Sequence, residues 1–135
     1  MRPGSSSRET TEVAPVLRTI SPADALPVNF EKALYHFDGD RDFMMQMFKQ
    51  YKDQLYKSVD EIHAALQDRD VNGLARLAHN LKGLSLNFSA DSLANITLNL
   101  EEICKREDLT GAPTLVAQLD VEARRVEEFL SNNLR

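Results

Sequence analysis

The sequence of 135 residues lacks several features on which whole classes of protein depend. Its single cysteine, Cys104, excludes an internal disulfide and favours a reducing, cytoplasmic location. No apolar run approaches the ~20 residues that cross a bilayer, so no membrane contact is expected. The first residues contain no apolar segment typical of a signal peptide. The five glycines are scattered and form no GxxxxGK[ST] loop, which argues against a nucleotide-binding kinase.

The sequence also has fewer positively charged than negatively charged side chains. The chain has 16 Lys and Arg against 21 Asp and Glu, for a net charge of −5. Because nucleic acids are held mainly through cationic side chains, they are not expected as partners. With 42% hydrophobic and 27% charged residues the composition is that of a globular protein, and the length suits one domain.

Proline is nearly absent beyond residue 27. Four of the five prolines lie in residues 1–27, which are rich in Ser and Thr and show no sustained periodicity. We expect this leader to be a flexible linker or tail, and its first residues, MRPGSSS, are also compatible with an expression remnant. Residues 28–135 are expected to form a single helical domain.

Helical periodicity with three-four spacing dominates that domain, and no apolar–polar alternation predicts a strand. Five helices are expected, over residues 29–37, 40–67, 71–88, 90–107 and 113–133. Their expected N-caps or first-turn residues are Asn29, Asp40 or Asp42, Asp70, Ser89 and Pro113. The fold class is therefore all-α: an antiparallel up-down four-helix bundle, with the short N-terminal helix capping one end.

One histidine lies on the solvent side of its expected helix. In residues 77–88, LAHNLKGLSLNF, the leucines at the core spacing and Phe88 fall in a narrow arc. His79 projects on the order of 170° away from the centre of that arc. Exposed histidines are common, so position alone does not make His79 functional. His63 and His36 have no such surroundings and are interpreted as structural or incidental.

The neighbours of His79 strengthen the hypothesis that this histidine is functional. Gly83, one turn away, costs roughly 1 kcal/mol relative to alanine in a helix interior, which suggests that it clears space for the ring. Lys82 places an ammonium where it would favour a phosphoryl group. Ala75 and Leu86 lie on the same side, where a partner could rest, although scattered exposed leucines are normal. Arg76 and Asn80 are expected to be docking or solubilising residues.

The surroundings of His79 do not suit several kinds of site. No second His, Cys or carboxylate lies at i±4 on that face, so neither a metal nor a bound cofactor is expected. A hydrolase triad needs a cleft that excludes water, which a convex helix does not offer. Attack by a neutral imidazole on a phosphoryl group delivered by another protein fits such an open site best.

AHNLKGLS, followed by SADSLANITLNLEE, resembles the signature of histidine phosphotransfer (HPt) domains of phosphorelays. The resemblance spans residues 28–134. Serine stands at position 89, where that family usually has glycine, and a slightly different turn is expected there. Ten positions match: Ala78, His79, Leu81, Lys82, Gly83, Ser85, Ala90, Leu93, Leu100 and Glu101.

The resemblance implies a phosphorelay carrier without autokinase activity. A receiver-domain aspartate would pass a phosphoryl group to Nε2 of His79, and a second receiver would take it, reversibly. Lys82 would pair with the phosphoryl oxygens, Gly83 would give the receiver room, and Mg²⁺ would come from the receiver. Glu101, at the level of His79 across a hairpin, lies where the related domain of chemotaxis kinases carries a glutamate that holds its histidine. The alternative for Glu101 is a solvated surface carboxylate.

Two other functions remain open from the sequence. The chain could be a non-catalytic helical adaptor that binds a receiver domain, or the phosphorylatable input domain of a chemotaxis-type kinase. The expected partners are response-regulator receiver domains, together with a hybrid histidine kinase if the chain is a module of one. A monomer is expected because the docking face must stay free.

Overall fold

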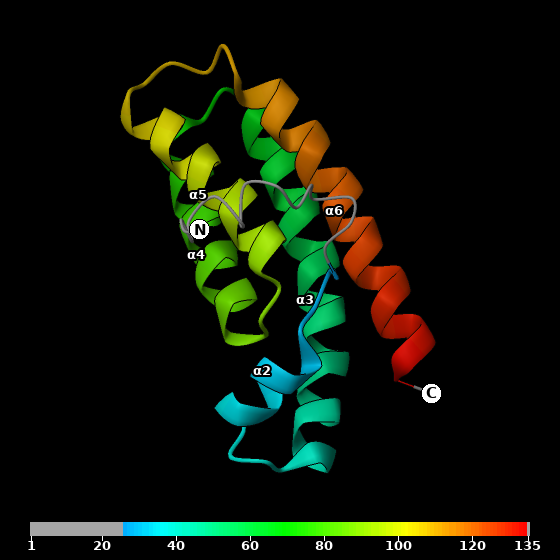
Figure 1. Ribbon diagram of the computed structural model, residues 1–135. Coiled ribbons are helices and arrows are strands. Elements are labelled where there is room, and N and C mark those ends of the chain that lie inside the picture. Colours follow the sequence, from blue (N-terminus) through cyan, green and yellow to red (C-terminus); the bar gives the residue numbers. More distant parts are fainter. Residues whose placement is uncertain (1–25, 135) are drawn as a thin grey trace, which may run out of the picture.

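The computed structural model describes residues 26–134, and all of its regular structure is helical. Figure 1 shows a short helix at one end of four longer ones. The helices are α2 (Phe30–His36), α3 (Arg41–Gln67), α4 (Val71–Asn87), α5 (Asp91–Lys105) and α6 (Ala112–Asn133). The expected all-α bundle is thus confirmed, and each helix begins and ends within about two residues of its expected bounds.

Three of the helices begin at side-chain caps that the sequence predicts. The side chain of Asn29 accepts a hydrogen bond from the backbone of Lys32, which starts α2. Asp40, rather than Asp42, accepts from Phe43 at the start of α3. Asp70 accepts from Gly73 at the start of α4. Because each carboxylate or amide satisfies a donor that the first turn leaves free, the helix starts are fixed locally.

The expectation that Ser89 caps α5 is wrong. Ala90 is the N-cap residue, and no side chain in the described part of the chain caps this helix. Ser89 instead has φ of +56° and closes the end of α4, where Ala90 N donates to Ser85 O at 2.9 Å. This left-handed position after a helix is the one that most often holds glycine. The left-handed backbone conformation therefore explains why glycine is usual at this position in the HPt domains that the sequence resembles.

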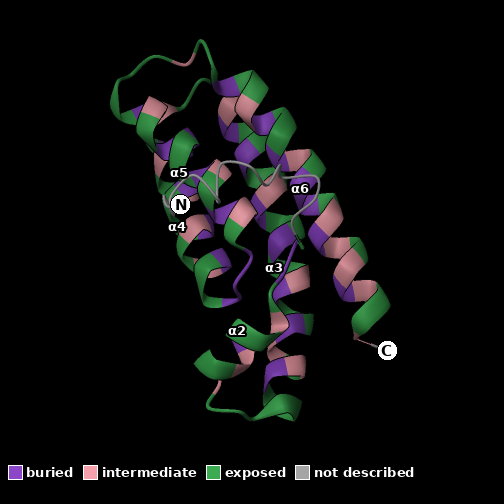
Figure 2. Cartoon of the chain, in the orientation of Figure 1, coloured by how far each residue is buried: buried purple, intermediate pink, exposed green. Residues whose placement is uncertain are grey.

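The four long helices form a closed bundle in which α3 packs against α4 and α6, and α5 also packs against α4 and α6. Short connections make sequential helices antiparallel neighbours. Their buried faces line the interior while the outer faces are exposed (Figure 2). The short helix α2 covers one end, where Phe30 contacts Phe48 and Phe129 at centroid distances of 5.1 and 5.3 Å.

The leader falls almost wholly outside the described residues, so its expected flexibility stays a prediction, as does the boundary at residue 28. Val28 is already buried, with 1% of its surface exposed. Within residues 26–134 no helix is long and apolar enough to cross a membrane.

Candidate functional site

His79 lies on the solvent face of α4, with 62% of its side chain exposed. Its Nδ1 is hydrogen-bonded to Oε2 of Glu101 on α5 at 2.9 Å. Since an ionised carboxylate can only accept, this contact assigns the proton to Nδ1 and leaves the lone pair on Nε2. The ring is thus held in one orientation by the bond at Nδ1, while most of the side chain is open to solvent.

Glu101 is nearly buried, and both of its carboxylate oxygens are engaged. Oε1 accepts from Lys82 Nζ at 2.9 Å, while Oε2 bonds His79. The hydrogen bond from Lys82 lowers the pKa of Glu101 most; burial opposes it, and the bond to His79 lowers the pKa further. The carboxylate is therefore charged at neutral pH. The sequence left open whether this residue was a solvated carboxylate, and the structure places it against the histidine.

Lys82 reaches from α4 across to α5, with 23% of its side chain exposed. Its ammonium shares the carboxylate of Glu101 with His79, so it is fixed beside the imidazole rather than extended into water. A cation in this place is available to a charged group that arrives at Nε2.

Gly83 is not required by the packing of the domain itself. A Cβ added there would meet nothing within 4 Å. The glycine still weakens the helix by roughly 1 kcal/mol relative to alanine. No packing contact among the described residues therefore requires glycine at this position.

The remaining residues expected at the docking face are spread around His79. Ala75 is half-buried and packs against the core, and Leu86 is 48% exposed. Arg76 and Asn80 line a hollow of about 360 Å³ between α4 and α3. The side of this hollow formed by α3 and its C-cap was not predicted, because the lateral packing of two helices leaves no local signal in the sequence. The residues on that side include Gln54, Ser58, Glu61 and Asp68.

A buried contact behind the site was also not foreseen. Ser85, on the inner face of α4, forms a hydrogen bond of 3.0 Å with the hydroxyl of Tyr51 on α3. The ring of Tyr51 stacks on Phe88 at a centroid distance of 4.5 Å. The serine matched within the HPt signature thus fixes the histidine helix to its neighbour. The period of α3 places Tyr51 in the core but does not reveal the partner of its hydroxyl.

No group of three or more His, Cys, Asp or Glu side chains in the described part of the chain could hold a metal ion. His63, interpreted as structural, pairs with Asp120 at 2.7 Å on another part of the surface. Among the contacts of the described residues, His79 is the histidine that combines exposure with a hydrogen-bonded ring and a neighbouring cation.

Comparison with known proteins matches this chain to a protein family. Residues 46–129 match the family described as the Hpt domain. The matched range includes α4 and α5 in full, and with them His79, Lys82, Gly83 and Glu101.

Relatives and solved structures agree with that match. Histidine-containing phosphotransfer protein B from Pseudomonas aeruginosa superposes with a TM-score of 0.76 at 26% identity, over 82% of this chain and 96% of that one. The HPT domain of a Shewanella sensor hybrid histidine kinase gives 0.72 at 21% identity, over 80% and 93%, which is a likeness of fold. The phosphorelay intermediate protein rdeA of Dictyostelium discoideum is 21% identical over 95 residues, 70% of this chain. The aligned region spans only 37% of that relative.

Proposed function

Because this chain belongs to the Hpt domain family, we propose that His79 is the residue on which it carries phosphoryl groups. The role of the domain is that of a phosphotransfer carrier in a phosphorelay. The observation that supports His79 most strongly is its hydrogen bond from Nδ1 to Glu101, which orients the exposed ring and leaves Nε2 free to attack.

In the proposed step, the lone pair of Nε2 attacks the phosphorus of an aspartyl phosphate on a receiver domain. The N–P bond forms as the bond between phosphorus and the aspartate oxygen breaks, and the receiver carboxylate leaves. The proton stays on Nδ1, where the positive charge that develops on the ring faces the carboxylate of Glu101. Transfer to a second receiver is the same step in reverse.

Lys82 is proposed to bind the oxygens of the phosphoryl group. In a loose, highly charged transition state, positioned cations account for much of the stabilisation. Glu101 holds the Lys82 ammonium beside His79 in the resting domain. Exchange of that bond for a phosphoryl oxygen requires only a change in the long lysine side chain.

The partners are proposed to be response-regulator receiver domains, with docking on Ala75, Arg76, Asn80 and Leu86. Mg²⁺ is proposed to come from the receiver, since the Glu101 carboxylate beside His79 is already bonded to Lys82 and the ring. The domain is proposed to act as a monomer in the cytoplasm. A hybrid histidine kinase is a proposed source of the phosphoryl group.

The proposal is tested by incubation with a receiver domain that carries labelled aspartyl phosphate. The chain is expected to take up acid-labile, alkali-stable phosphate on His79. His79→Gln should take up none, whereas His63→Gln, which changes another exposed histidine, should match the unaltered chain. Equal labelling of His79→Gln would show that the assignment is wrong.

Two further variants test the roles of the neighbours. Lys82→Ala is expected to slow transfer on the order of ten-fold or more while receiver binding is kept. Glu101→Gln should slow transfer more than Glu102→Gln, which alters the exposed neighbouring carboxylate. A helical adaptor without chemistry would show binding and no transfer in any of these experiments.

One observation also favours a second candidate, the input domain of a chemotaxis-type kinase. The bond between Glu101 and His79 is the arrangement that the resemblance to that related domain implies. Such a domain takes its phosphate from ATP through a separate kinase core. Labelling of His79 by a kinase core with ATP, and not by a phosphorylated receiver, would favour this candidate.

A further inference from the structure

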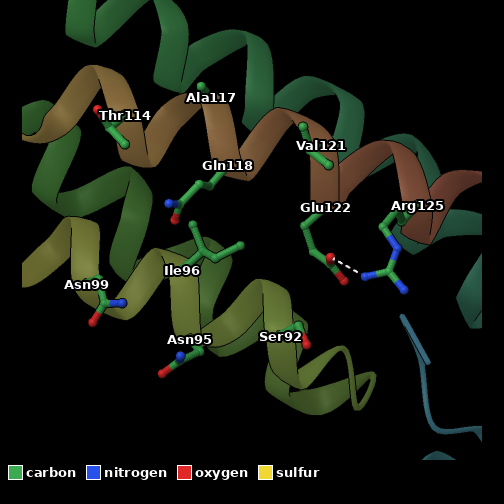
Figure 3. A pocket seen from close by; sticks show the side chains of 10 residues that line it. All are labelled: Ser92, Asn95, Ile96, Asn99, Thr114, Ala117, Gln118, Val121, Glu122 and Arg125. Carbon is green, nitrogen blue, oxygen red and sulfur yellow. Dashed lines mark hydrogen bonds and ion pairs between the residues drawn. The ribbon is translucent and has the colours of Figure 1, made fainter. Parts of the chain in front are cut away.

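A hollow larger than the one beside Arg76 and Asn80 lies away from His79, between α5 and α6 (Figure 3). It has a volume of about 710 Å³. Glu101 points from α5 toward α4, whereas Ile96 and Asn99 line the groove that faces α6. The groove has an apolar floor edged by amide side chains: Ile96, Ala117 and Val121 with Asn95, Asn99 and Gln118. A binding surface here is therefore separate from the phosphotransfer face.

The wall of this groove contains a carboxylate that lacks one of its partners. Glu122 is only 3% exposed, and its Oε1 accepts from Arg125 at 2.7 Å. Its Oε2 is buried and has no hydrogen-bond partner among the described residues. Burial raises the pKa of Glu122, although Arg125 opposes the shift. Because a buried polar atom without a partner is costly, Oε2 is expected to receive a donor from an occupant of the groove.

The described chain begins at the mouth of the same groove. Asn29 N–H donates to Ser89 O at 3.1 Å, just before α5, and Lys32 pairs with Asp91 at 2.7 Å. Phe30 contacts Phe129 on α6, one turn beyond Arg125. The first described residues therefore lie close to the start of α5 and the last turns of α6, where Ser92 and Arg125 line the groove.

We propose that the groove between α5 and α6 is an intramolecular binding site for residues 13–20 of the leader, VAPVLRTI. Their apolar side chains, Val13, Val16, Leu17 and Ile20, match the apolar floor. Arg18 is the only charged residue among them and complements the carboxylate of Glu122.

The leader is long enough for residues 13–20 to span the groove. The groove extends along α6 from Thr114 to Arg125, a length of about 17 Å at ~1.5 Å per residue. About five residues in extended form span that distance, and residues 21–27 are available as the connection. Because the attachment point lies at the mouth, the effective concentration of the segment at the groove is high.

The site is tested in the full chain by NMR with labelled methyl groups. Cross-relaxation is expected between the methyls of Leu17 or Ile20 and those of Ile96 or Val121, with equal relative intensity at two protein concentrations ten-fold apart. Leu17→Asp should abolish these contacts and lower the melting temperature, whereas Thr10→Asp, a matched change outside the segment, should leave both unaltered. Arg18→Glu should weaken the contacts.

Val121→Asp tests the groove from its other side. Because Val121 is 60% exposed, this change should leave the packing of the bundle core intact. This variant should lose the contacts to Leu17 while phosphotransfer through His79 is unchanged. The proposal would be overturned by absent contacts, by contacts that survive Leu17→Asp, or by contacts that appear only at high concentration, which would indicate a second copy. None of these outcomes bears on the role of His79, which the labelling experiment tests separately.

Discussion

At the scale of the residue, the site depends on one nearly buried carboxylate that serves two donors. Glu101 bonds both His79 and Lys82, each at 2.9 Å. A buried carboxylate with a single partner would be costly, and the two bonds together keep it charged. The same charge fixes the tautomer of the imidazole and holds the ammonium beside it. One side chain therefore positions both His79 and Lys82.

Gly83→Ala is expected to separate stability from function. The added Cβ meets nothing within 4 Å, so the helix should gain up to about 1 kcal/mol in the free energy of unfolding. The methyl group would instead meet a docked receiver, and transfer should slow on the order of ten-fold or more. Urea unfolding and transfer kinetics measure the two effects.

Gly111→Ala is the control for this variant, because a Cβ at Gly111 also meets nothing within 4 Å and the residue lies at the start of α6. Its transfer rate should be unchanged. A wild-type transfer rate in Gly83→Ala would contradict the assignment of Gly83 as clearance for the partner.

Ser89→Gly is expected to stabilise the domain by about 1 kcal/mol, because Ser89 has φ of +56°, a conformation that glycine adopts without strain. Within residues 26–134, the buried serine hydroxyl also has no hydrogen-bond partner. Thermal and urea unfolding measure the change. Ser89→Ala removes only the hydroxyl, so the difference between the two variants reports the backbone contribution. A loss of stability in Ser89→Gly would show that the turn is not strained.

At the scale of the element, four helices end in the same way. The residues after the C-caps of α2, α3, α4 and α5 all have positive φ, and none is glycine: Asp38, Arg69, Ser89 and Glu107. At each end a backbone N–H reaches back to a carbonyl of the last turn. These turns let short connections reverse the chain direction. The turn at Ser89 joins α4 to α5, the two helices that carry His79 and Glu101.

The histidine helix is fixed to α3 by a buried pair of hydroxyls. Tyr51→Phe is expected to destabilise the domain by about 1 kcal/mol or more, because Ser85 would lose its partner in the core. Ser85→Ala should cost a similar amount by leaving the Tyr51 hydroxyl unpaired. The double variant should cost less than the sum of the two, as urea unfolding of all four proteins would measure. Strict additivity would show that the two hydroxyls do not interact.

At the scale of the whole molecule, the lowered pKa of Glu101 makes stability depend on pH. The folded state keeps this carboxylate charged where the unfolded chain has begun to take up a proton, so its contribution is present above the ordinary pKa of 4.5 and is lost as pH falls through the folded value. In Glu101→Gln the decrease in unfolding free energy below that pH should be smaller. Urea unfolding across acidic pH measures it, with Glu102→Gln as the control. An identical decrease in both variants would contradict the role of Glu101.

The sequence by itself determined the elements and the chemical type of the site. Three-four periodicity and the caps at Asn29, Asp40 and Asp70 depend on neighbours within a few residues, so the helices could be predicted closely. The same periodicity set His79 outside the core, and the spacing of Lys82 and Gly83 set its surroundings.

Only the tertiary structure decided how the helices are rotated and spaced against one another. That arrangement gives Glu101 two donors at once, pairs Ser85 with Tyr51, places Ser89 in a left-handed turn and leaves Glu122 with an unpartnered oxygen in a groove. Each of these features joins residues far apart in the chain or depends on backbone dihedral angles. Local patterns of hydrophobicity do not specify either, because the rotation of one helix against another is fixed only when the whole core packs.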